Sequence, residues 1–391
     1  MNSKAKKILI IIIVVLALIF IGLLVYYYFF RKIPLPFGPK GQLPPTEEGA
    51  KKEKEEKERE IPKAALKIKA ISNEPVISPT ITADKNQVIY YSRVNGHIWQ
   101  SDFDGTNLNM VSDANLDNLI KVIWSPNKDL AITVFEDAFG NVSKFLYSFA
   151  DKKTTQLNKY TNYIVWSPDG KKIAYQYQND FTGDNTLSIA NPDGSNYEIV
   201  LKTRIKNLKL DWPKGDNLFF QEKPSGIVTS SIYSLNLKNK SFSKVSSDVY
   251  GLSVKWSPDG NKMLYSKTTS QGKPLGLYVV NRNMSNPQTL NILTLVEKCA
   301  WSQDVRYIYC AAPRNINDAA LLPDDFYKGK FAADDDFFKI NVETGEKIKL
   351  LQNSEMPETY DANDVFLSPN ENYFFFVNKA NGLLYSIKLI E

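Results

Sequence analysis

The chain has 391 residues and a formal net charge of +5, and 43% of its residues are hydrophobic, enough for a sizeable core. Residues 1–64 carry 12 of the 48 basic and 7 of the 43 acidic residues, so the remainder of the chain is neutral, with 36 of each sign. A neutral body without a basic block excludes nucleic acid from the expected partners, and two cysteines are too few for a disulfide framework.

The first 30 residues have the pattern of a membrane anchor. A short basic tail, residues 1–7, precedes residues 8–30, which carry no charge and would span about 34 Å as a helix. Residues 26–30 are all aromatic and Arg31 and Lys32 follow them, as at a membrane interface. No small-residue cleavage site follows, so we expect an uncleaved signal anchor rather than a removed signal peptide. The short basic tail predicts a cytoplasmic N-terminus and places the rest of the chain outside.

Residues 31–64 are rich in proline, glycine and charge, and residues 51–60 contain five basic and five acidic side chains. Such a stretch cannot bury enough apolar surface to fold by itself. We interpret it as a disordered stalk between the anchor and the domain at residues 65–391, rather than as a docking segment.

A motif related to Trp-Ser-Pro-Asp-Gly recurs through residues 73–391. Aligned on the tryptophan, its seven copies fall at Ile81, Trp124, Trp166, Trp212, Trp256, Trp301 and Leu367. Successive copies lie 43, 42, 46, 44, 45 and 66 residues apart. In each copy an apolar strand precedes the turn, an alternating strand follows it, and a third strand lies downstream. A period in the low forties, built from short strands, predicts the blades of a propeller.

We therefore expect an all-β, seven-bladed β-propeller, with six or eight blades as alternatives, behind one transmembrane helix and a stalk. The residues expected to build the repeat turns are Trp124, Ser125, Pro126, Trp166, Ser167, Pro168, Asp169, Gly170, Trp212, Trp256, Ser257, Pro258, Asp259, Gly260, Trp301, Ser368 and Pro369. These turns, each followed by an aliphatic and aromatic strand and often by an Asp-Gly turn, resemble the repeats of TolB-like propellers. The resemblance implies the fold, but many functions share it.

Blade seven shows only three strands in its own stretch of sequence. Residues 65–72 alternate apolar and polar residues ahead of the first repeat. We expect them to supply the missing outer strand, which would close the ring and remove an exposed edge.

The sequence nominates no catalytic or metal site. The single histidine, His97, has no evident nucleophile or orienting carboxylate beside it. The aspartate-rich stretches at 102–105 and 334–336 lack the ligand spacing of a calcium loop. No Gly-x-Ser-x-Gly nucleophile elbow is present either. We expect neither a metal nor another cofactor.

Cys299 and Cys310 flank the sixth turn and are expected on paired strands of one hairpin. They form either a disulfide, which would suit an oxidising exterior, or two buried thiols.

The 66-residue spacing after Trp301 places about 20 extra residues between the second and third strands of blade six, within residues 313–336. Long loops on a rigid scaffold concentrate binding residues. The residues expected to contact a partner are Leu322, Asp324, Asp325, Phe326, Tyr327 and Lys328. The alternative is a loop that only covers its own blade.

Together these features predict a membrane-anchored propeller outside the cytoplasm. We expect a non-catalytic binding module for an envelope protein or glycan, attached to the bilayer through residues 8–30. The alternative is a hydrolase or lyase with acidic catalytic residues from several blades over the central channel. A deep channel mouth with close carboxylates of shifted pKa would favour the enzyme, and a shallow polar rim would favour the binding module.

Overall fold

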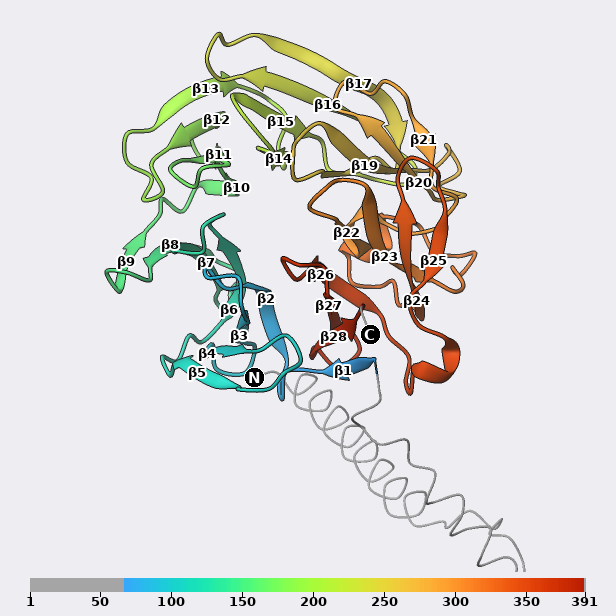
Figure 1. Ribbon diagram of the computed structural model, residues 1–391. Coiled ribbons are helices and arrows are strands. Elements are labelled where there is room, and N and C mark those ends of the chain that lie inside the picture. The colour runs from blue at the N-terminus through green and yellow to red at the C-terminus, as the bar shows by residue number, and fades with distance from the viewer. Residues whose placement is uncertain (1–66, 390–391) are drawn as a thin grey trace, which may run out of the picture. The chain divides into compact units, whose positions relative to one another are not determined.

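In the computed structural model, which describes residues 67–389, seven four-stranded antiparallel sheets are arranged as blades around a central channel (Figure 1). The predicted all-β, seven-bladed propeller is confirmed, and the six- and eight-bladed alternatives are wrong. The predicted anchor at residues 8–30 and the stalk at residues 31–64 lie outside the described residues. Within residues 67–389 no helix has the length and apolar character needed to cross a bilayer.

Each of blades one to six uses four strands that are consecutive in the chain, with the first strand against the channel. Blades one to three contain β2 (Val76–Ile81), β3 (Val88–Ser92), β4 (Ile98–Ser101) and β5 (Asn109–Ser112); β6 (Leu119–Trp124), β7 (Leu130–Glu136), β8 (Val142–Ser148) and β9 (Lys153–Gln156); and β10 (Thr161–Trp166), β11 (Ile173–Asn179), β12 (Asp184–Ala190) and β13 (Glu198–Lys202). Blades four to six contain β14 (Lys209–Asp211), β15 (Asn217–Gln221), β16 (Thr229–Asn236) and β17 (Phe242–Tyr250); β18 (Ser253–Trp256), β19 (Lys262–Lys267), β20 (Gly276–Asn281) and β21 (Gln288–Thr289); and β22 (Cys299–Trp301), β23 (Tyr307–Pro313), β24 (Asp335–Asn341) and β25 (Lys347–Lys349).

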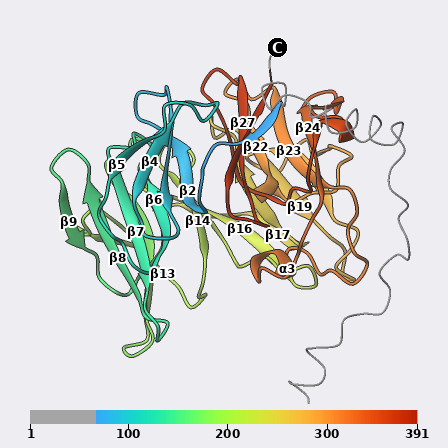
Figure 2. The same cartoon turned by 90° about the horizontal axis from the view of Figure 1, so that it is seen from below.

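Three short helices lie between strands of the described residues. They are the 3-10 helix η2 (Val296–Lys298) before β22, the α-helix α3 (Asp324–Tyr327) between β23 and β24, and the 3-10 helix η3 (Asn353–Glu355) after β25. In the side view α3 lies at the lower edge of the ring (Figure 2).

Blade seven joins the two ends of the domain. It consists of β26 (Ala362–Leu367), β27 (Tyr373–Asn378), β28 (Leu384–Lys388) and β1 (Ile68–Ala70), the last pairing antiparallel with β28. The Ile68 side chain is 1% exposed and packs into the core shared by blades six and seven. The expected closure by residues 65–72 is therefore confirmed, and it leaves β28 with a partner on both sides.

The repeat turns are held by their own serine and aspartate side chains. In blade three the Ser167 hydroxyl donates to Asp169 at 2.6 Å and accepts from the backbone N–H of Lys172 at 2.9 Å. The same serine–aspartate hydrogen bond recurs between Ser257 and Asp259 in blade five. These bonds satisfy the polar groups of the turn locally, which explains why one motif recurs in several blades.

The tryptophan before the turn usually reaches the preceding blade. The indole N–H of Trp124 donates to the Ser78 carbonyl at 2.7 Å, and that of Trp166 donates to the Ile123 carbonyl at 3.1 Å. Trp212 differs, because its N–H bonds the Gly215 carbonyl in its own turn at 2.8 Å. The indoles thus join successive blades by a hydrogen bond as well as by apolar burial.

A buried ionic cluster lies where blades six and seven meet. The Lys298 ammonium lies 2.6 Å from an oxygen of Asp335 and 2.7 Å from an oxygen of Asp361, and the three side chains are 0%, 0% and 8% exposed. The carboxylates also accept the backbone N–H groups of Ala362 and Ala333. Charges this deeply buried persist only when paired and hydrogen-bonded.

Candidate binding site in the central channel

The channel holds a cavity of about 1030 Å³. Its walls come from the innermost strands β2, β6, β14, β18 and β26, together with η2 and the segment around α3. The charged residues among its lining are Lys121, Lys209, Asp211, Lys255, Glu297, Asp364 and Lys379. A cavity in which aromatic and charged side chains from several blades converge is the kind of site in which ligands bind.

Two positions of the repeat supply most of these charges. Lys121, Lys209 and Asp364 each lie three residues before the tryptophan position, and Asp211 and Lys255 lie one residue before it. Residues two apart on a strand share a face, so both positions point into the channel. The sequence analysis gave a site over the channel as its alternative but named none of these charged residues. The pattern that could have identified the site is the recurrence of charged residues one and three positions before the repeat tryptophan, within inner strands that are otherwise apolar.

The inner strands bulge at the first of these positions in three blades. Ser78, Tyr163 and Asp364 have φ angles of 48°, 52° and 49°, and the pairing of their strands is irregular there. A positive φ is costly for residues other than glycine and clusters at functional sites. The channel wall is therefore locally strained at the residues that face the cavity.

The channel lysines bond backbone carbonyls. Lys209 donates to the Val254 carbonyl at 2.7 Å, and Lys255 donates to the Cys299 carbonyl. Among residues 67–389, no ion pair joins Lys121, Lys209 or Lys255 to a carboxylate. Burial lowers the pKa of Lys255 to about 8, because its charge is poorly hydrated there.

The pKa values of two channel carboxylates are raised, whereas that of Lys255 is lowered. Burial raises the pKa of Asp211 to about 6, although Lys209 and a hydrogen bond from Trp256 favour its charged form. Loss of hydration also raises the pKa of Asp364. Oε2 of Glu297 and Oδ1 of Asn363 are buried oxygens that accept no hydrogen bond within the described part of the chain. Asp211 and Asp364 are therefore channel carboxylates of raised pKa, which is one of the features that the enzyme alternative requires.

The insertion of blade six packs against its neighbours. Leu322 is 3% exposed and clusters with Leu275, Leu295 and Phe331. An oxygen of Asp324 accepts the backbone N–H of Gly226 in blade four at 2.7 Å.

The other predicted contact residues divide between the loop and the cavity. Asp325 accepts the N–H of Leu321 within the loop at 2.8 Å, and Lys328 is exposed. Phe326 and Tyr327 line the channel cavity. The tyrosine hydroxyl lies 2.7 Å from the hydroxyl of Ser253 and donates to Glu297. The six predicted residues are thus not one exposed surface.

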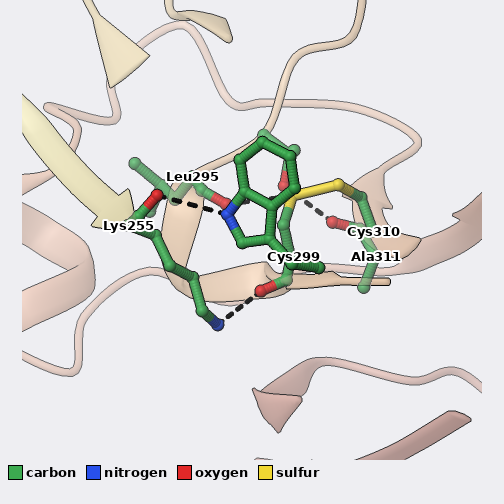
Figure 3. Close-up of a disulfide and its surroundings, with 7 residues drawn as sticks. Lys255, Leu295, Cys299, Cys310 and Ala311 are labelled. Atoms are coloured by element: carbon green, nitrogen blue, oxygen red, sulfur yellow. Dashed lines mark hydrogen bonds between the residues drawn. A yellow bond between two sulfur atoms is a disulfide. The ribbon is translucent and has the colours of Figure 1, made fainter. Parts of the chain in front are cut away.

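The two cysteines form a disulfide between the first two strands of blade six (Figure 3). Cys299 and Cys310 are opposite each other on β22 and β23, with Cα atoms 4.1 Å apart. The carbonyl of Cys299 is the one that accepts the Lys255 ammonium (Figure 3). The disulfide therefore cross-links the strand that positions a channel lysine.

The other polar residues singled out in the sequence have local partners. His97 bonds the Asn115 side chain at 3.0 Å, and Asp102 accepts hydrogen bonds from Gln87 and Asn107. Asp334 and Asp336 both pair with Arg314. Across residues 67–389 no three His, Cys, Asp or Glu side chains gather so that they could hold a metal ion.

Comparisons with known proteins support the fold. No family model and no curated protein sequence matches the chain. An oligogalacturonate lyase in complex with manganese is 14% identical, with 83% of this chain and 93% of that chain covered and a TM-score of 0.59. The β-propeller domain of Myceliophteria thermophila Cps50 (Swd1) is 9% identical, with 83% and 100% covered and a TM-score of 0.52. TolB from Acinetobacter baumannii is 14% identical, with 72% and 64% covered and a TM-score of 0.45. At these identities the likeness is one of fold alone, that of a β-propeller.

Proposed function

We propose that this protein is a membrane-anchored propeller of the cell envelope that binds a glycan in its central channel without transforming it. The observation that carries the proposal is the cavity of about 1030 Å³ with aromatic and charged side chains on its wall. Trp124, Trp256, Phe326 and Tyr327 line this cavity, and aromatic rings suit the apolar faces of sugar rings. The unpartnered oxygens of Glu297 and Asn363 suit sugar hydroxyls, which donate hydrogen bonds.

A binding measurement on the full chain in detergent tests the proposal. We expect calorimetry with a panel of neutral and acidic hexasaccharides to give at least one saturable interaction. Replacing Phe326 and Tyr327 together by alanine should weaken it by about 2 kcal/mol or more, as for aromatic anchors. The matched control removes Phe139 and Phe181, which are 91% and 94% exposed on loops of blades two and three. Loss of affinity in the control alone would move the site out of the channel.

The placement in the envelope needs its own test. Added protease should remove the propeller from intact cells and spare residues 1–30, since the proposed anchor leaves only residues 1–7 in the cytoplasm. A protected propeller would reverse the orientation without touching the binding proposal.

A lyase is the second candidate function. Asp211 and Lys255 occupy equivalent positions on adjacent blades, and their pKa values of about 6 and about 8 lie on either side of neutrality. Such a pair suits proton transfer at neutral pH. Asp211, mostly ionised at pH 7, would take the proton next to a sugar carboxylate, the carbon–oxygen bond would break as a double bond forms, and the Lys255 ammonium would protonate the leaving oxygen. The oligogalacturonate lyase of similar fold makes this reaction class worth testing.

The two functions separate in one assay. Incubation with oligogalacturonate, followed by the ultraviolet absorbance of the unsaturated product, should show no turnover for a binding module. Turnover that disappears in Asp211→Asn and in Lys255→Met would establish the lyase instead.

A further inference from the structure

We propose that the mouth of the channel over blades two to four selects an acidic sugar, whose negative group lies between Lys121, Lys209 and Lys223 and whose ring lies on Tyr163. This inference rests on the proposed function, because it names the class of glycan that the same channel would select.

A second cavity, of about 660 Å³, adjoins the channel cavity at this mouth. Lys121, Lys209, Glu297 and Tyr327 line both cavities. A ligand in the channel can therefore extend into the second cavity without leaving the wall of the propeller.

The mouth is positively charged. Of the described residues that line the second cavity, Lys121, Lys209 and Lys223 are basic and Glu297 is the one acid. Glu297 is partly engaged, because the Tyr327 hydroxyl donates to it. Lys209 donates one of its three N–H groups to the Val254 carbonyl, so two N–H groups can donate to a ligand. No carboxylate among the described residues forms an ion pair with these three ammonium groups. A sugar carboxylate or sulfate would supply a direct partner in addition to the nearby Asp211 and Asp364.

Tyr163 lies between two of the lysines in the order of the blades. Lys121, Tyr163 and Lys209 occupy the same repeat position in blades two, three and four. Tyr163 has a φ of 52°, a costly conformation for a bulky residue, and its hydroxyl donates to Asn207 at 2.6 Å. The fold thus fixes a ring that is 43% exposed at the mouth. A preset aromatic face flanked by ammonium groups fits an acidic sugar ring better than a flexible acidic peptide.

The test compares an acidic ligand with its neutral methyl ester. Calorimetry on the full chain in detergent would use hexagalacturonate and its fully methyl-esterified form. We expect the acid to bind at least about tenfold more tightly than the ester, and its affinity to fall as salt rises, because exposed charges are screened. A sulfated hexasaccharide tests whether the site accepts sulfate as well as carboxylate.

Matched variants locate the effect. Lys121→Gln with Lys209→Gln should weaken binding of the acid by about 30- to 100-fold and weaken binding of the ester much less, because the ester loses only neutral hydrogen bonds. The control, Lys153→Gln with Lys244→Gln, removes the same charge from exposed outer strands and should change neither. Tyr163→Asn, which tolerates positive φ, should weaken both ligands by about tenfold.

The outcomes separate the two proposals. Equal affinity for acid and ester, unaffected by the lysine variants, would overturn the acidic-sugar inference and leave glycan binding in place. Failure of these ligands and of every glycan in the panel to bind would overturn the proposed function itself. If the sulfated ligand binds more tightly than the carboxylated one, the site still selects an anionic sugar, but the group that it recognises is a sulfate.

Discussion

The hydroxyl of Tyr327, in the insertion of blade six, lies 2.7 Å from the hydroxyl of Ser253 on the innermost strand of blade five. Ser253 is 0% exposed, so this contact brings the insertion to the channel wall. The insertion therefore has a packing role in addition to any role in binding. Its residues should differ sharply in what their removal does.

Within the insertion, Leu322→Ala should lower the free energy of unfolding by about 2–4 kcal/mol, because it empties a buried apolar site. Lys328→Ala should change it by less than about 0.5 kcal/mol, since Lys328 is exposed. Chemical denaturation of the two variants measures both. Equal, small effects would mean that the insertion does not pack as described.

If β1 closes the ring, replacing its buried residue should reduce stability much more than replacing its exposed neighbour. Ile68 is 1% exposed, whereas Lys69 is exposed beside it. Ile68→Ala should cost about 2–4 kcal/mol of stability, and Lys69→Ala should cost less than about 0.5 kcal/mol. Deleting residues 65–72 should cost more than either, because the paired strand is lost with its hydrogen bonds. An unchanged melting temperature after the deletion would contradict this role of β1.

The repeat tryptophans should not be equivalent. Trp166 is 7% exposed and bonds the preceding blade, whereas Trp212 bonds only its own turn. We expect Trp166→Ala to cost about 3–5 kcal/mol and Trp212→Ala to cost clearly less. Urea unfolding of the two variants provides the comparison, and a larger loss for Trp212→Ala would reverse our account of the turn.

The cluster of Lys298 with Asp335 and Asp361 should tolerate complete replacement better than partial replacement. Lys298→Met leaves two buried carboxylates without a cation and should cost about 3–5 kcal/mol. Adding Asp335→Asn and Asp361→Asn removes the unpaired charges and should recover part of that loss. The measurement is the melting temperature of the single and triple variants, and a triple variant less stable than the single one would be inconsistent with a charge effect.

Asp211 should make stability depend on pH. Its pKa is about 6 in the folded protein against an ordinary value of 3.8, so the folded state keeps this proton to higher pH than the unfolded state does. The contribution of Asp211 to the free energy of unfolding therefore decreases by about 3 kcal/mol as pH rises from about 4 to about 6, and it stays low above that. Asp211→Asn should remove this decrease. Parallel pH profiles of the wild type and the variant would show that Asp211 does not cause it.

The local pattern of the chain was enough to predict the blades. The Trp-Ser-Pro-Asp-Gly turns carry their own hydrogen bonds, as between Ser167 and Asp169, so their conformation depends mainly on neighbouring residues. The period of the repeat then predicted seven blades, and the alternation in residues 65–72 predicted the closing strand β1. The predicted anchor, stalk and orientation remain predictions, because residues 1–66 lie outside the described part of the chain.

The channel site depended on the tertiary structure. Lys121, Lys209 and Lys255 are far apart in the sequence, and only closure of the ring directs their side chains into one cavity, where reduced hydration shifts the pKa of Lys255. The insertion shows the same limit. Its mixture of apolar and charged residues suggested an exposed surface, yet Leu322 is buried and Tyr327 reaches Ser253 of another blade. Local sequence determines turns and strands because their interactions are short-range. Burial and charge environment are set by residues from other blades, so only the assembled ring decides them.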